Sequence, residues 1–275
     1  MFVVFEHRTL GERRSSREHR SLFGTTFEYD VVMVTEMPTP AWKRTRPASA
    51  QRVALTRDVI VAAAIRLLDR DGLDGVSMRR VAEELNTGAA SLYAHVANKE
   101  ELLDLVLDEI CAEVVIPDPD PARWQQQIRD VVLQSSRVYA AHRDIAFVAL
   151  GSIPTGPNAL RIAEGMFSIL IAGGVPPKVA GWSLDRLALY VCADAFEGSI
   201  LFKRQIESGL SVEDFFEQYV GTVREFYSKL PPDRFPTITK HLGDMMGGDS
   251  EQRFEFGLDM IIRSLETYVP APRSA

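Results

Sequence analysis

Apolar residues recur with the 3.6-residue period of an α-helix from residue 56 onward. The first apolar face is formed by Ile60, Ala63, Ala64, Leu67 and Leu68. Thr56 precedes this face, where a threonine hydroxyl accepts a hydrogen bond from the free N–H groups of the first turn. Gly72 and Gly75 permit a turn within RDGLDG, so the sequence predicts a first helix between Thr56 and this turn.

Two shorter helical segments follow, separated by a three-residue turn. The second helix is predicted to begin after Ser77, a good N-cap, and its apolar face is formed by Met78, Val81, Ala82 and Leu85. The turn is NTG, residues 86–88, and the third segment is AASLYAHV, residues 89–96. Leu92 and Val96 lie four residues apart in that segment and are predicted to face inward.

A fourth helix is predicted to begin within NKEE, residues 98–101. Asn98 is a favourable cap, and Glu101 three positions later has the spacing of a capping box. The apolar face of this helix is formed by Leu103, Val106, Leu107 and Ile110. A domain boundary is predicted where prolines end the helix, at Pro117, Pro119 and Pro121.

The rest of the chain is predicted to contain only helices, because no stretch alternates apolar and polar residues as a strand does. The predicted helices cover residues 122–142, 143–150, 158–173, 177–204, 212–229 and 252–268. SGLSVEDFF and the stretch from Pro231 to Ser250 are interpreted as loops, and no internal repeat is found. The sequence therefore predicts an all-α fold.

Charge is distributed unevenly along the chain. The formal net charge of −7 argues against a nucleic-acid partner when the chain is taken as a whole. Residues 41–100, however, contain ten Lys or Arg and seven Asp or Glu, whereas residues 101–275 contain sixteen and twenty-five. A modestly positive segment beside an acidic one suits a protein that presents one end to an anion.

The composition is that of a soluble globular protein, with 46% hydrophobic and 25% charged residues among 275. The apolar runs are shorter than the roughly 18–20 residues that span a bilayer, and no secretory signal is found. Cys111 and Cys192 lie in apolar helical segments. Two buried thiols in a cytoplasmic protein are the favoured interpretation, and a single disulfide is the alternative.

Residues 1–40 lack sustained periodicity, and residues 1–50 are expected to form a mostly disordered extension. One interpretation is that the extension includes residues from an upstream start, with Met33 and Met37 as internal starts. The other is a basic arm that lies on DNA beside the first helix, formed by Lys43, Arg44 and Arg46.

Two short helices joined by a three-residue turn and packed on a longer helix make a helix-turn-helix. A helix enters the major groove of DNA only if its partner helix holds it so that it protrudes from the protein surface. Small residues such as Ala82 and Gly88 let the backbones of the two helices come close together. The outward or flanking residues of the third segment are Ala89, Ala90, Ser91, Tyr93, Ala94 and His95. A groove-reading helix can have this little bulk, whereas a buried catalytic helix would not.

The run from Leu55 to Ile110 resembles the DNA-binding domain of the TetR family of repressors. The specific signature LYxHVxNKxxLL is formed by Leu92, Tyr93, His95, Val96, Asn98, Lys99, Leu102 and Leu103. Residues 142–154 and 253–266 resemble segments of the tetracycline-repressor-like subfamily. The resemblance implies a helix-turn-helix DNA-binding domain over residues 51–115 and a helical effector-binding and dimerisation domain over residues 120–270.

The resemblance also implies roles for individual residues. Arg79 matches an arginine that reads guanine, a pairing that discriminates between bases by about 1–3 kcal/mol. Tyr93 and His95 match residues that hold phosphates or the groove wall, and Lys99 matches a phosphate contact at a helix N-terminus. The expected DNA-binding residues are Thr56, Ser77, Met78, Arg79, Gly88, Ala89, Ala90, Ser91, Tyr93, Ala94, His95 and Lys99.

Two departures from the tetracycline repressor change what this chain is expected to recognise. Glutamine, proline and tryptophan of its recognition helix are replaced by Ala89, Ala90 and Ala94, so methyl contacts to thymine would replace amide contacts to adenine. A histidine that holds a magnesium–drug complex is replaced by Ala149, so magnesium–tetracycline is not expected as the ligand. No cofactor and no metal site is predicted.

A small apolar or aromatic effector is expected in the C-terminal domain. The candidate ligand-binding residues are Trp124, Phe147, Phe167, Trp182, Tyr190, Asp194 and Phe196. Asp194 and Glu197 lie three apart in an apolar helix and could form a polar spot. The alternative for each aromatic residue is a place in the core, which is where helically spaced aromatic side chains are found more often.

The last helix carries a continuous apolar stripe of Phe254, Leu258, Ile261, Ile262 and Leu265. In a monomer this stripe would be core. Together with the helix over 177–204 it would build a four-helix dimer interface, as the TetR family does. A homodimer is favoured because a single helix-turn-helix grips half a site weakly, whereas a two-fold dimer binds both halves of a palindrome.

The favoured function is a cytoplasmic, dimeric transcriptional repressor that a small-molecule effector releases from a palindromic operator in double-stranded DNA. A DNA-binding activator, or a regulator without an effector, is the alternative. An enzyme or carrier is not favoured, and no catalytic residue is assigned. The sequence shows no metal-ligand spacing of His, Cys, Asp or Glu, no nucleophile in a GxSxG setting and no Gly-rich phosphate loop after a strand.

Overall fold

The computed structural model describes residues 19–20, 26–27 and 54–270. The chain divides into two units, Met1–Val53 and Ala54–Ala275. In the first unit, strands β1 (His19–Arg20) and β2 (Thr26–Phe27) pair in antiparallel register. The rest of that unit, including the predicted basic arm and the predicted disorder of residues 1–50, lies outside the described residues.

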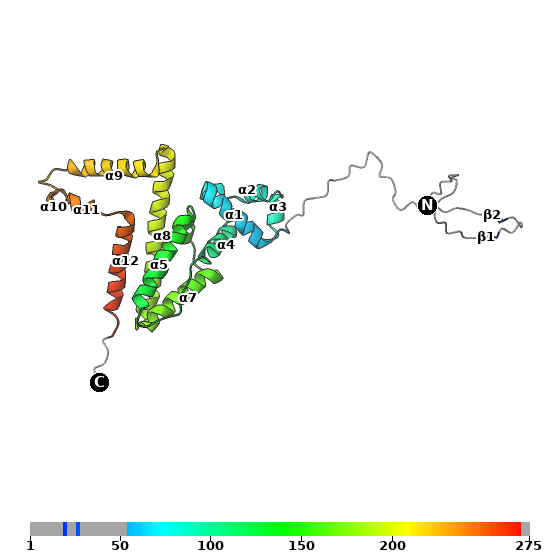
Figure 1. The fold of residues 1–275 in the computed structure, drawn as a ribbon, viewed down its shortest axis with the longest axis horizontal. Coiled ribbons are helices and arrows are strands. Elements are labelled where there is room, and N and C mark those ends of the chain that lie inside the picture. The colour runs from blue at the N-terminus through cyan, green and yellow to red at the C-terminus, as the bar shows by residue number, and fades with distance from the viewer. Residues whose placement is uncertain (1–18, 21–25, 28–53, 271–275) are drawn as a thin grey trace, which may run out of the picture. The chain divides into compact units, whose positions relative to one another are not determined.

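The second unit is built from helices (Figure 1). They are α1 (Arg57–Asp71), the 3₁₀ turn η1 (Leu73–Gly75), α2 (Met78–Glu84), α3 (Ala89–Leu92), α4 (Lys99–Cys111), α5 (Trp124–Ala141), α6 (Ile145–Gly151), α7 (Pro157–Ala172), α8 (Pro177–Ser208), α9 (Val212–Ser228), α10 (Pro236–Lys240), α11 (Leu242–Met245) and α12 (Ser250–Glu266). The all-α prediction is confirmed, and β1 and β2 are the strands found in the part of the chain that the structure describes.

Side-chain caps fix the starts of the first two helices as predicted. The Thr56 hydroxyl accepts a hydrogen bond from the Val59 N–H at 3.3 Å, and the Ser77 hydroxyl accepts one from the Arg80 N–H at 3.2 Å. Each hydroxyl satisfies a backbone donor that the first helical turn leaves without a partner.

The predicted capping box of α4 forms only in part. Asn98 Oδ1 accepts from the Glu101 N–H at 2.8 Å, as expected for the cap. The Glu101 carboxylate, however, accepts from the Ala97 N–H at 2.6 Å and not from the N–H of Asn98. The return bond therefore ties the helix to the residue before its cap.

The turn between α2 and α3 owes its sharpness to Asn86, whose φ of 52° is left-handed. The Thr87 N–H donates to the Ala82 carbonyl at 2.9 Å and the Asn86 N–H donates to the Glu83 carbonyl at 3.0 Å, which is the Schellman pattern. Ala82 is buried as expected. The interpretation of Gly88 is wrong, because a Cβ there would meet no heavy atom within 4 Å.

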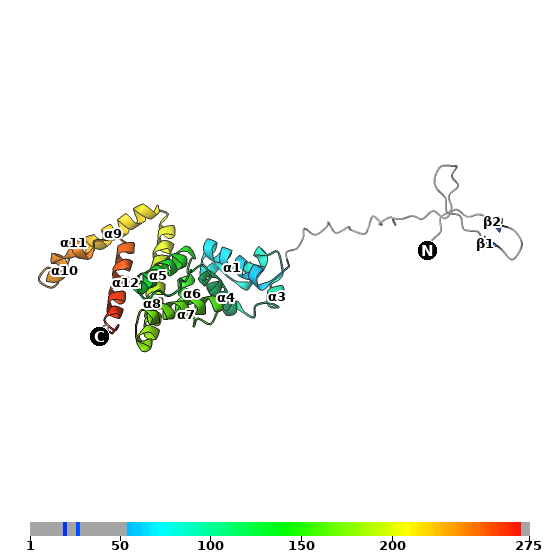
Figure 2. The same cartoon turned by 60° about the horizontal axis from the view of Figure 1, so that its bottom comes forward.

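One apolar core runs through α1–α8 and α12. Its largest fully buried side chains are Ile60, Leu67, Leu68, Leu92, Leu102, Ile110, Ile128, Ile145, Ile169, Leu170, Leu187 and Leu258. The inward positions of Leu92 and Val96 are confirmed. Helix α4 packs against α1 on one side and against α5, α6 and α7 on the others (Figure 2), so it belongs to both predicted domains. On its predicted apolar face Leu103 is only half-buried, and the neighbouring Leu102 is buried instead.

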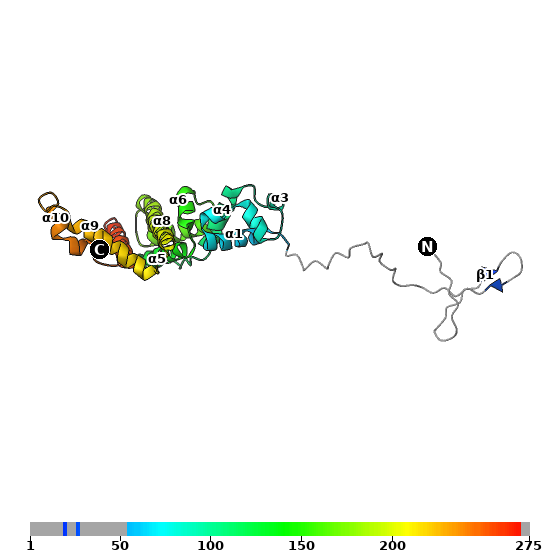
Figure 3. The same cartoon turned by 90° about the horizontal axis from the view of Figure 1, so that it is seen from above.

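The segment from the end of α8 to α11 differs from the prediction. The stretch interpreted as a loop between Pro231 and Ser250 contains α10 and α11. The helix predicted over residues 212–229 is confirmed as α9, so only residues 209–211 of SGLSVEDFF lie outside a helix. Helices α9–α11 stand away from the bundle (Figures 1 and 3). Helix α9 has no buried residue although it carries Phe215, Phe216, Tyr219, Val220 and Phe226.

The helix-turn-helix closely approaches the turn before α6 at Gly72, which ends α1 with φ 73° and ψ −176°. This region of backbone conformation is nearly restricted to glycine. A Cβ on Gly72 would lie 2.6 Å from Asp144 Oδ2, the atom that accepts the Leu73 N–H at 3.0 Å. Glycine is therefore required both by the backbone and by the neighbouring carboxylate.

We expect Gly72→Ala to lower the free energy of unfolding by about 2–4 kcal/mol, because it adds contact with Asp144 to backbone strain of about 1–3 kcal/mol. The matched control is Gly209→Ala, which has φ 68° but no heavy atom within 4 Å of the added Cβ. It is expected to cost about 1–2 kcal/mol. Urea unfolding of both variants measures the difference, and equal losses would contradict the role of the Asp144 contact.

Candidate DNA-binding surface and ligand cavity

The exposed surface of the helix-turn-helix is formed by α3 and the turn that follows it. Tyr93 is 54% exposed. Exposed beside it are Gly88, Ala90, Ser91 and Ala94, and half-exposed are Ala89, His95 and Lys99. The structure therefore brings most of the predicted DNA-binding residues onto one short stretch of surface.

Arg79 projects from the first turn of α2, and its side chain is 81% exposed. Its Nε lies 3.5 Å from the Glu83 carboxylate one turn later. Such an exposed pair is worth only about 0.3–0.5 kcal/mol, so it leaves the guanidinium free to exchange partners. Arg79 is therefore exposed and held only by a weak ion pair, which leaves its guanidinium available to another partner.

Three other predicted DNA-binding residues have structural tasks. Met78 is only 8% exposed and packs in the core, so the prediction of a groove contact for it is wrong. Ser77 is half-buried and caps α2. Thr56 caps α1 but is exposed. A capping hydroxyl accepts a hydrogen bond and can still donate its own proton, which a phosphate oxygen could accept.

Arg57 was not predicted and holds the turn between α3 and α4. Its Nε and Nη2 donate to the His95 carbonyl at 3.4 and 3.3 Å, and its Nη2 lies 3.8 Å from the Glu101 carboxylate. Since the same carboxylate accepts the Ala97 N–H, Arg57 and Glu101 together fix the backbone over residues 95–97. The sequence offered one signal, an arginine in the first turn of α1, but not its distant partner.

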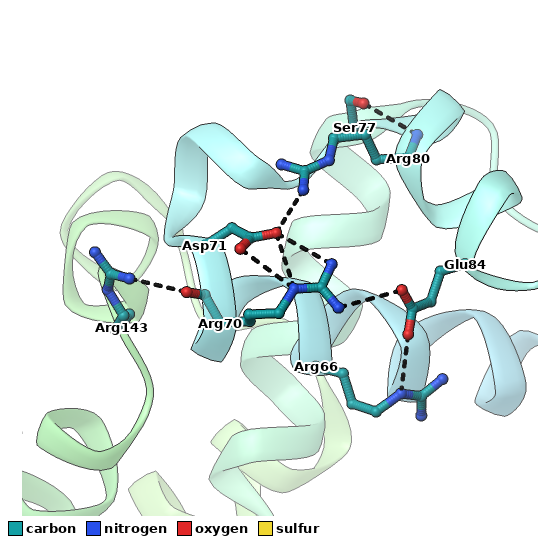
Figure 4. Close-up of polar contacts among 7 residues, drawn as sticks. All are labelled: Arg66, Arg70, Asp71, Ser77, Arg80, Glu84 and Arg143. Atoms are coloured by element: carbon teal, nitrogen blue, oxygen red, sulfur yellow. Dashed lines mark hydrogen bonds and ion pairs between the residues drawn. The ribbon is translucent and has the colours of Figure 1, made fainter.

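An ionic cluster joins the end of α1 to α2 (Figure 4). The Asp71 carboxylate accepts from Arg80 Nη2 at 2.5 Å and from Arg70 Nε at 3.1 Å. Desolvation raises the pKa of Asp71, but the hydrogen bonds from Arg70 and Arg80 outweigh it and the net pKa is lowered. Glu84 on α2 pairs with Arg66 and Arg70 on α1, so the two helices are held by charges as well as by the core.

The turn between α5 and α6 contacts the end of α1 through consecutive polar residues. His142 lies 2.9 Å from Asp69 on α1 through Nδ1 and 3.0 Å from Glu113 through Nε2. Arg143 donates to the Arg70 carbonyl at 3.0 Å, as Figure 4 shows. The C-terminal helices are therefore joined to the ionic cluster of the helix-turn-helix by directional contacts.

A second polar joint links α4 to α6 and α7. Asp108 Oδ1 accepts the N–H groups of Asn158 and Ala159, each at 3.0 Å, and thereby caps α7. The Ser152 hydroxyl donates to Asp104 at 3.1 Å. Asp104 and Asp108 thus tie α4 to the end of α6 and to the start of α7 by hydrogen bonds.

A cavity of about 460 Å³ lies among α4, α5, α6, α7 and α8. It is lined by Leu107, Cys111, Val132, Ser135, Tyr139, Ala149, Leu150, Ser152, Pro154, Ala159, Ile162, Ala163, Met166, Gly181, Leu184, Asp185, Leu187, Ala188, Leu189, Val191 and Cys192. Its volume is that of a small-molecule site. Ala149, which stands where the tetracycline repressor has a histidine, is one of the lining residues.

Both cysteines line the cavity as free, buried thiols, which confirms the prediction over the alternative of a disulfide. Cys111 Sγ lies 3.7 Å from Tyr139 Oη. Burial raises the pKa of the Cys111 thiol, and burial followed by the charge of Cys111 raises the pKa of Cys192 to about 11. Burial also raises the pKa of the Tyr139 phenol, so both thiols and this phenol are uncharged at neutral pH.

None of the seven predicted ligand-binding residues lines this cavity. Trp124 is buried core, with its ring against Gly173. Phe167 packs against the core, and Phe147 and Phe196 pair at 5.8 Å between centroids. The prediction of an aromatic wall is therefore wrong for this cavity. The true lining was missed because aliphatic and small residues at helical spacing look the same in the sequence whether they line a cavity or fill the core.

Asp194, the predicted polar spot, is half-buried on α8 outside the cavity lining. Burial first, and then the charge of Glu197, raises the pKa of its carboxyl. The two remaining predicted residues line a surface groove between α8 and α12.

This α8–α12 groove is lined by Val179, Trp182, Ser183, Arg186, Leu189, Tyr190, Met260, Ile261, Ser264, Leu265 and Tyr268. Trp182 is 66% exposed and Met260 59%. Tyr190 stacks on Phe254 and donates to its carbonyl at 2.8 Å, which fixes one wall of the groove. An apolar surface of this kind is typical of an interface.

Among residues 19–20, 26–27 and 54–270, no helix has the length and apolar character that a membrane crossing requires. No group of three or more His, Cys, Asp or Glu side chains with metal-ligand geometry occurs among them.

Similar proteins match both halves of the chain. Residues 60–106 match the family model of bacterial regulatory proteins of the tetR family, and residues 116–269 match the tetracyclin repressor-like C-terminal domain. The transcriptional repressor DrrR1 of Streptomyces coeruleorubidus is 30% identical over 231 residues, which cover 83% of each chain.

A transcriptional regulator of Saccharopolyspora erythraea is 39% identical over 137 residues, which cover 50% of this chain and 58% of that protein. The solved structure of ActR from Streptomyces coelicolor in complex with actinorhodin is 38% identical with a TM-score of 0.71, over 80% of this chain and 100% of that one. Together with the helix-turn-helix and the cavity among α4–α8, these matches show that the chain belongs to the TetR family of bacterial transcriptional regulators.

Proposed function

We propose that this regulator represses transcription as a homodimer on a palindromic operator and that an effector in the α4–α8 cavity releases it. The observation that carries the proposal is the double role of α4. Lys99 at its first turn lies at the DNA-facing surface, and Leu107 and Cys111 further along form part of the cavity wall. One rigid helix thus touches both sites.

Release requires that the effector bind the non-operator conformation more tightly than the operator-bound one. A molecule that enters the cavity contacts α4 directly, and Asp104 and Asp108 join α4 to α6 and α7. A shift of α4 relative to those helices changes the position of Lys99 and of the turn before it. The two half-sites lie about 34–36 Å apart, so a small change in each monomer alters the match.

The α8–α12 groove supports a dimer built on these two helices, and α9 offers a further apolar surface without a buried residue. The proposed DNA contacts are the predicted DNA-binding residues without Met78. The proposed effector contacts are the residues that line the α4–α8 cavity, and not the seven residues predicted from the sequence. ActR with bound actinorhodin supports a small-molecule effector for this chain as well.

TetR-family members are transcriptional regulators and not enzymes, and we propose that this chain has no catalytic activity. An enzyme would convert the small molecule, whereas a regulator releases it unchanged. We also propose that the protein acts in the cytoplasm, which agrees with its two free thiols.

The proposal is tested by footprinting the purified protein on the DNA upstream of its own gene at physiological salt. A protected, roughly palindromic site is the expected result. Tight protection elsewhere would indicate a distant target, and no specific binding to any DNA would refute the proposed function.

We expect Arg79→Ala to relax sequence choice by about 1–3 kcal/mol at one base pair, because Arg79 is placed to read a base. Lys99→Ala and Tyr93→Ala are expected to weaken binding to all sequences alike, and Lys99→Ala should also reduce the salt slope by about 1. Titrations of operator and scrambled DNA at several salt concentrations measure both effects. If Arg79→Ala kept the full sequence specificity of the native protein, Arg79 would not be a base-reading residue.

Arg57→Ala is expected to weaken binding to all DNA about three- to tenfold, the value of a hydrogen bond of about 1 kcal/mol, with the salt slope unchanged. The reason is that Arg57 holds the His95 carbonyl and Glu101, so its loss loosens the turn without removing a phosphate contact. Lys99→Ala is the control that changes the slope. A slope lowered by about 1 in Arg57→Ala would show instead that Arg57 binds phosphate.

Met260→Asp is expected to convert the dimer to monomers and to weaken operator binding at least tenfold, because it places a carboxylate in an apolar interface. The residue is 59% exposed in the single chain, so the monomer should remain folded. The control is Val115→Asp, which is 68% exposed and outside the groove. Analytical ultracentrifugation measures the mass, and an intact Met260→Asp dimer would place the interface elsewhere.

A further inference from the structure

The cavity contains a hydroxyl group whose hydrogen-bonding capacity is poorly used. Tyr139 on α5 lines the wall and is half-buried. Within the described part of the chain, the polar contact of its Oη is Cys111 Sγ at 3.7 Å. A thiol sulfur is a weak acceptor, so the phenolic proton lacks a strong partner. Buried tyrosine hydroxyls usually find one.

The other polar side chains of the wall are already satisfied. The Ser135 hydroxyl donates to the Val131 carbonyl at 2.8 Å, and the Ser152 hydroxyl donates to Asp104. Asp185 is exposed at the mouth and is paired with Arg186. Most of the remaining lining is aliphatic, so Tyr139 is the hydroxyl available to a bound molecule.

The electrostatics of the wall disfavour a charged ligand. The lining contains no lysine, arginine or histidine, and its single ionisable carboxylate is Asp185. Burial, followed by the nearby Cys111, raises the pKa of the Tyr139 phenol, so it stays protonated and acts as a donor at physiological pH. A buried anion would have no compensating cation here, and an uncompensated buried charge is very costly.

We propose that Tyr139 donates the hydrogen bond that orients the effector, and that the effector is a neutral, largely apolar molecule with a carbonyl-type acceptor oxygen. The inference rests on the proposed function in one respect, that the α4–α8 cavity is the effector site. The cavity volume of about 460 Å³ suits a drug-sized small molecule. Tyr139 and Cys111 adjoin each other, so an acceptor held at Tyr139 also touches α4, the helix that carries Lys99.

The test uses Nile red, a neutral planar dye whose emission shifts to longer wavelength when its ring carbonyl accepts a hydrogen bond. The full-length dimer is titrated with the dye, and Tyr139→Phe is compared with the native protein. The variant keeps the ring and removes only the hydroxyl. We expect its Kd for the dye to rise about three- to tenfold, the value of one hydrogen bond, and the emission of the bound dye to shift to shorter wavelength.

Two matched variants separate the cavity from the surface groove, where the dye could also bind. Tyr190→Phe removes a tyrosine hydroxyl that lines the α8–α12 groove and should change neither reading. Ala163→Trp fills the cavity from α7 and should abolish the site that responds to Tyr139→Phe. If Ala163→Trp does not fold, as judged by circular dichroism, the smaller Ala159→Leu replaces it.

The anionic dye anilinonaphthalene sulfonate tests the charge preference and should not displace Nile red from the cavity. Displacement by this anion, or an unchanged Kd and emission in Tyr139→Phe, would overturn the inference. Operator footprints of native protein and Tyr139→Phe without dye are measured in parallel and should be equal. Loss of DNA binding in the native protein would refute the proposed function, whereas intact DNA binding with an unresponsive Tyr139→Phe would refute only the role of Tyr139.

Discussion

Helix α4 is held by apolar contacts on more than one side, and the rest of the second unit depends on this constraint. Leu102 and Ile110 are fully buried, and Leu107 and Cys111 are buried at the cavity wall. The helix has 13 residues and is about 20 Å long. A close-packed core does not deform gradually, so α4 forms one rigid element that runs from the turn before Lys99 to the cavity wall.

The joints around α4 differ from its packing in the type of interaction. Asp104 and Asp108 hold α6 and α7, and the turn at His142 holds the end of α1. Hydrogen bonds and exposed ion pairs contribute little net stability but are directional. They fix the angle between the helix-turn-helix and the C-terminal helices while leaving the apolar core to supply most of the folding free energy.

A single chain leaves much apolar surface uncovered. The α8–α12 groove and all of α9 expose large side chains, among them Trp182, Met260 and Phe226. Such patches are rare on monomers, and TetR-family members bind operator DNA as dimers. A two-fold dimer also supplies a second helix-turn-helix. Dimerisation would therefore bury exposed apolar surface and would strengthen DNA binding beyond the weak affinity of one helix-turn-helix for a half-site.

The sequence by itself determined most of the helices, the helix-turn-helix and the family, because these depend on local signals. Caps at Thr56, Ser77 and Asn98, the apolar period and the signature around Tyr93 all act within a few residues. Only the tertiary structure decided that Met78 is core and that Arg57 holds the His95 carbonyl. It also decided that the cavity is lined by aliphatic residues, two thiols and Tyr139, and by none of the seven residues predicted for ligand binding. A cavity wall and a core face have the same period along a helix, and the difference between them lies in which distant helices meet there.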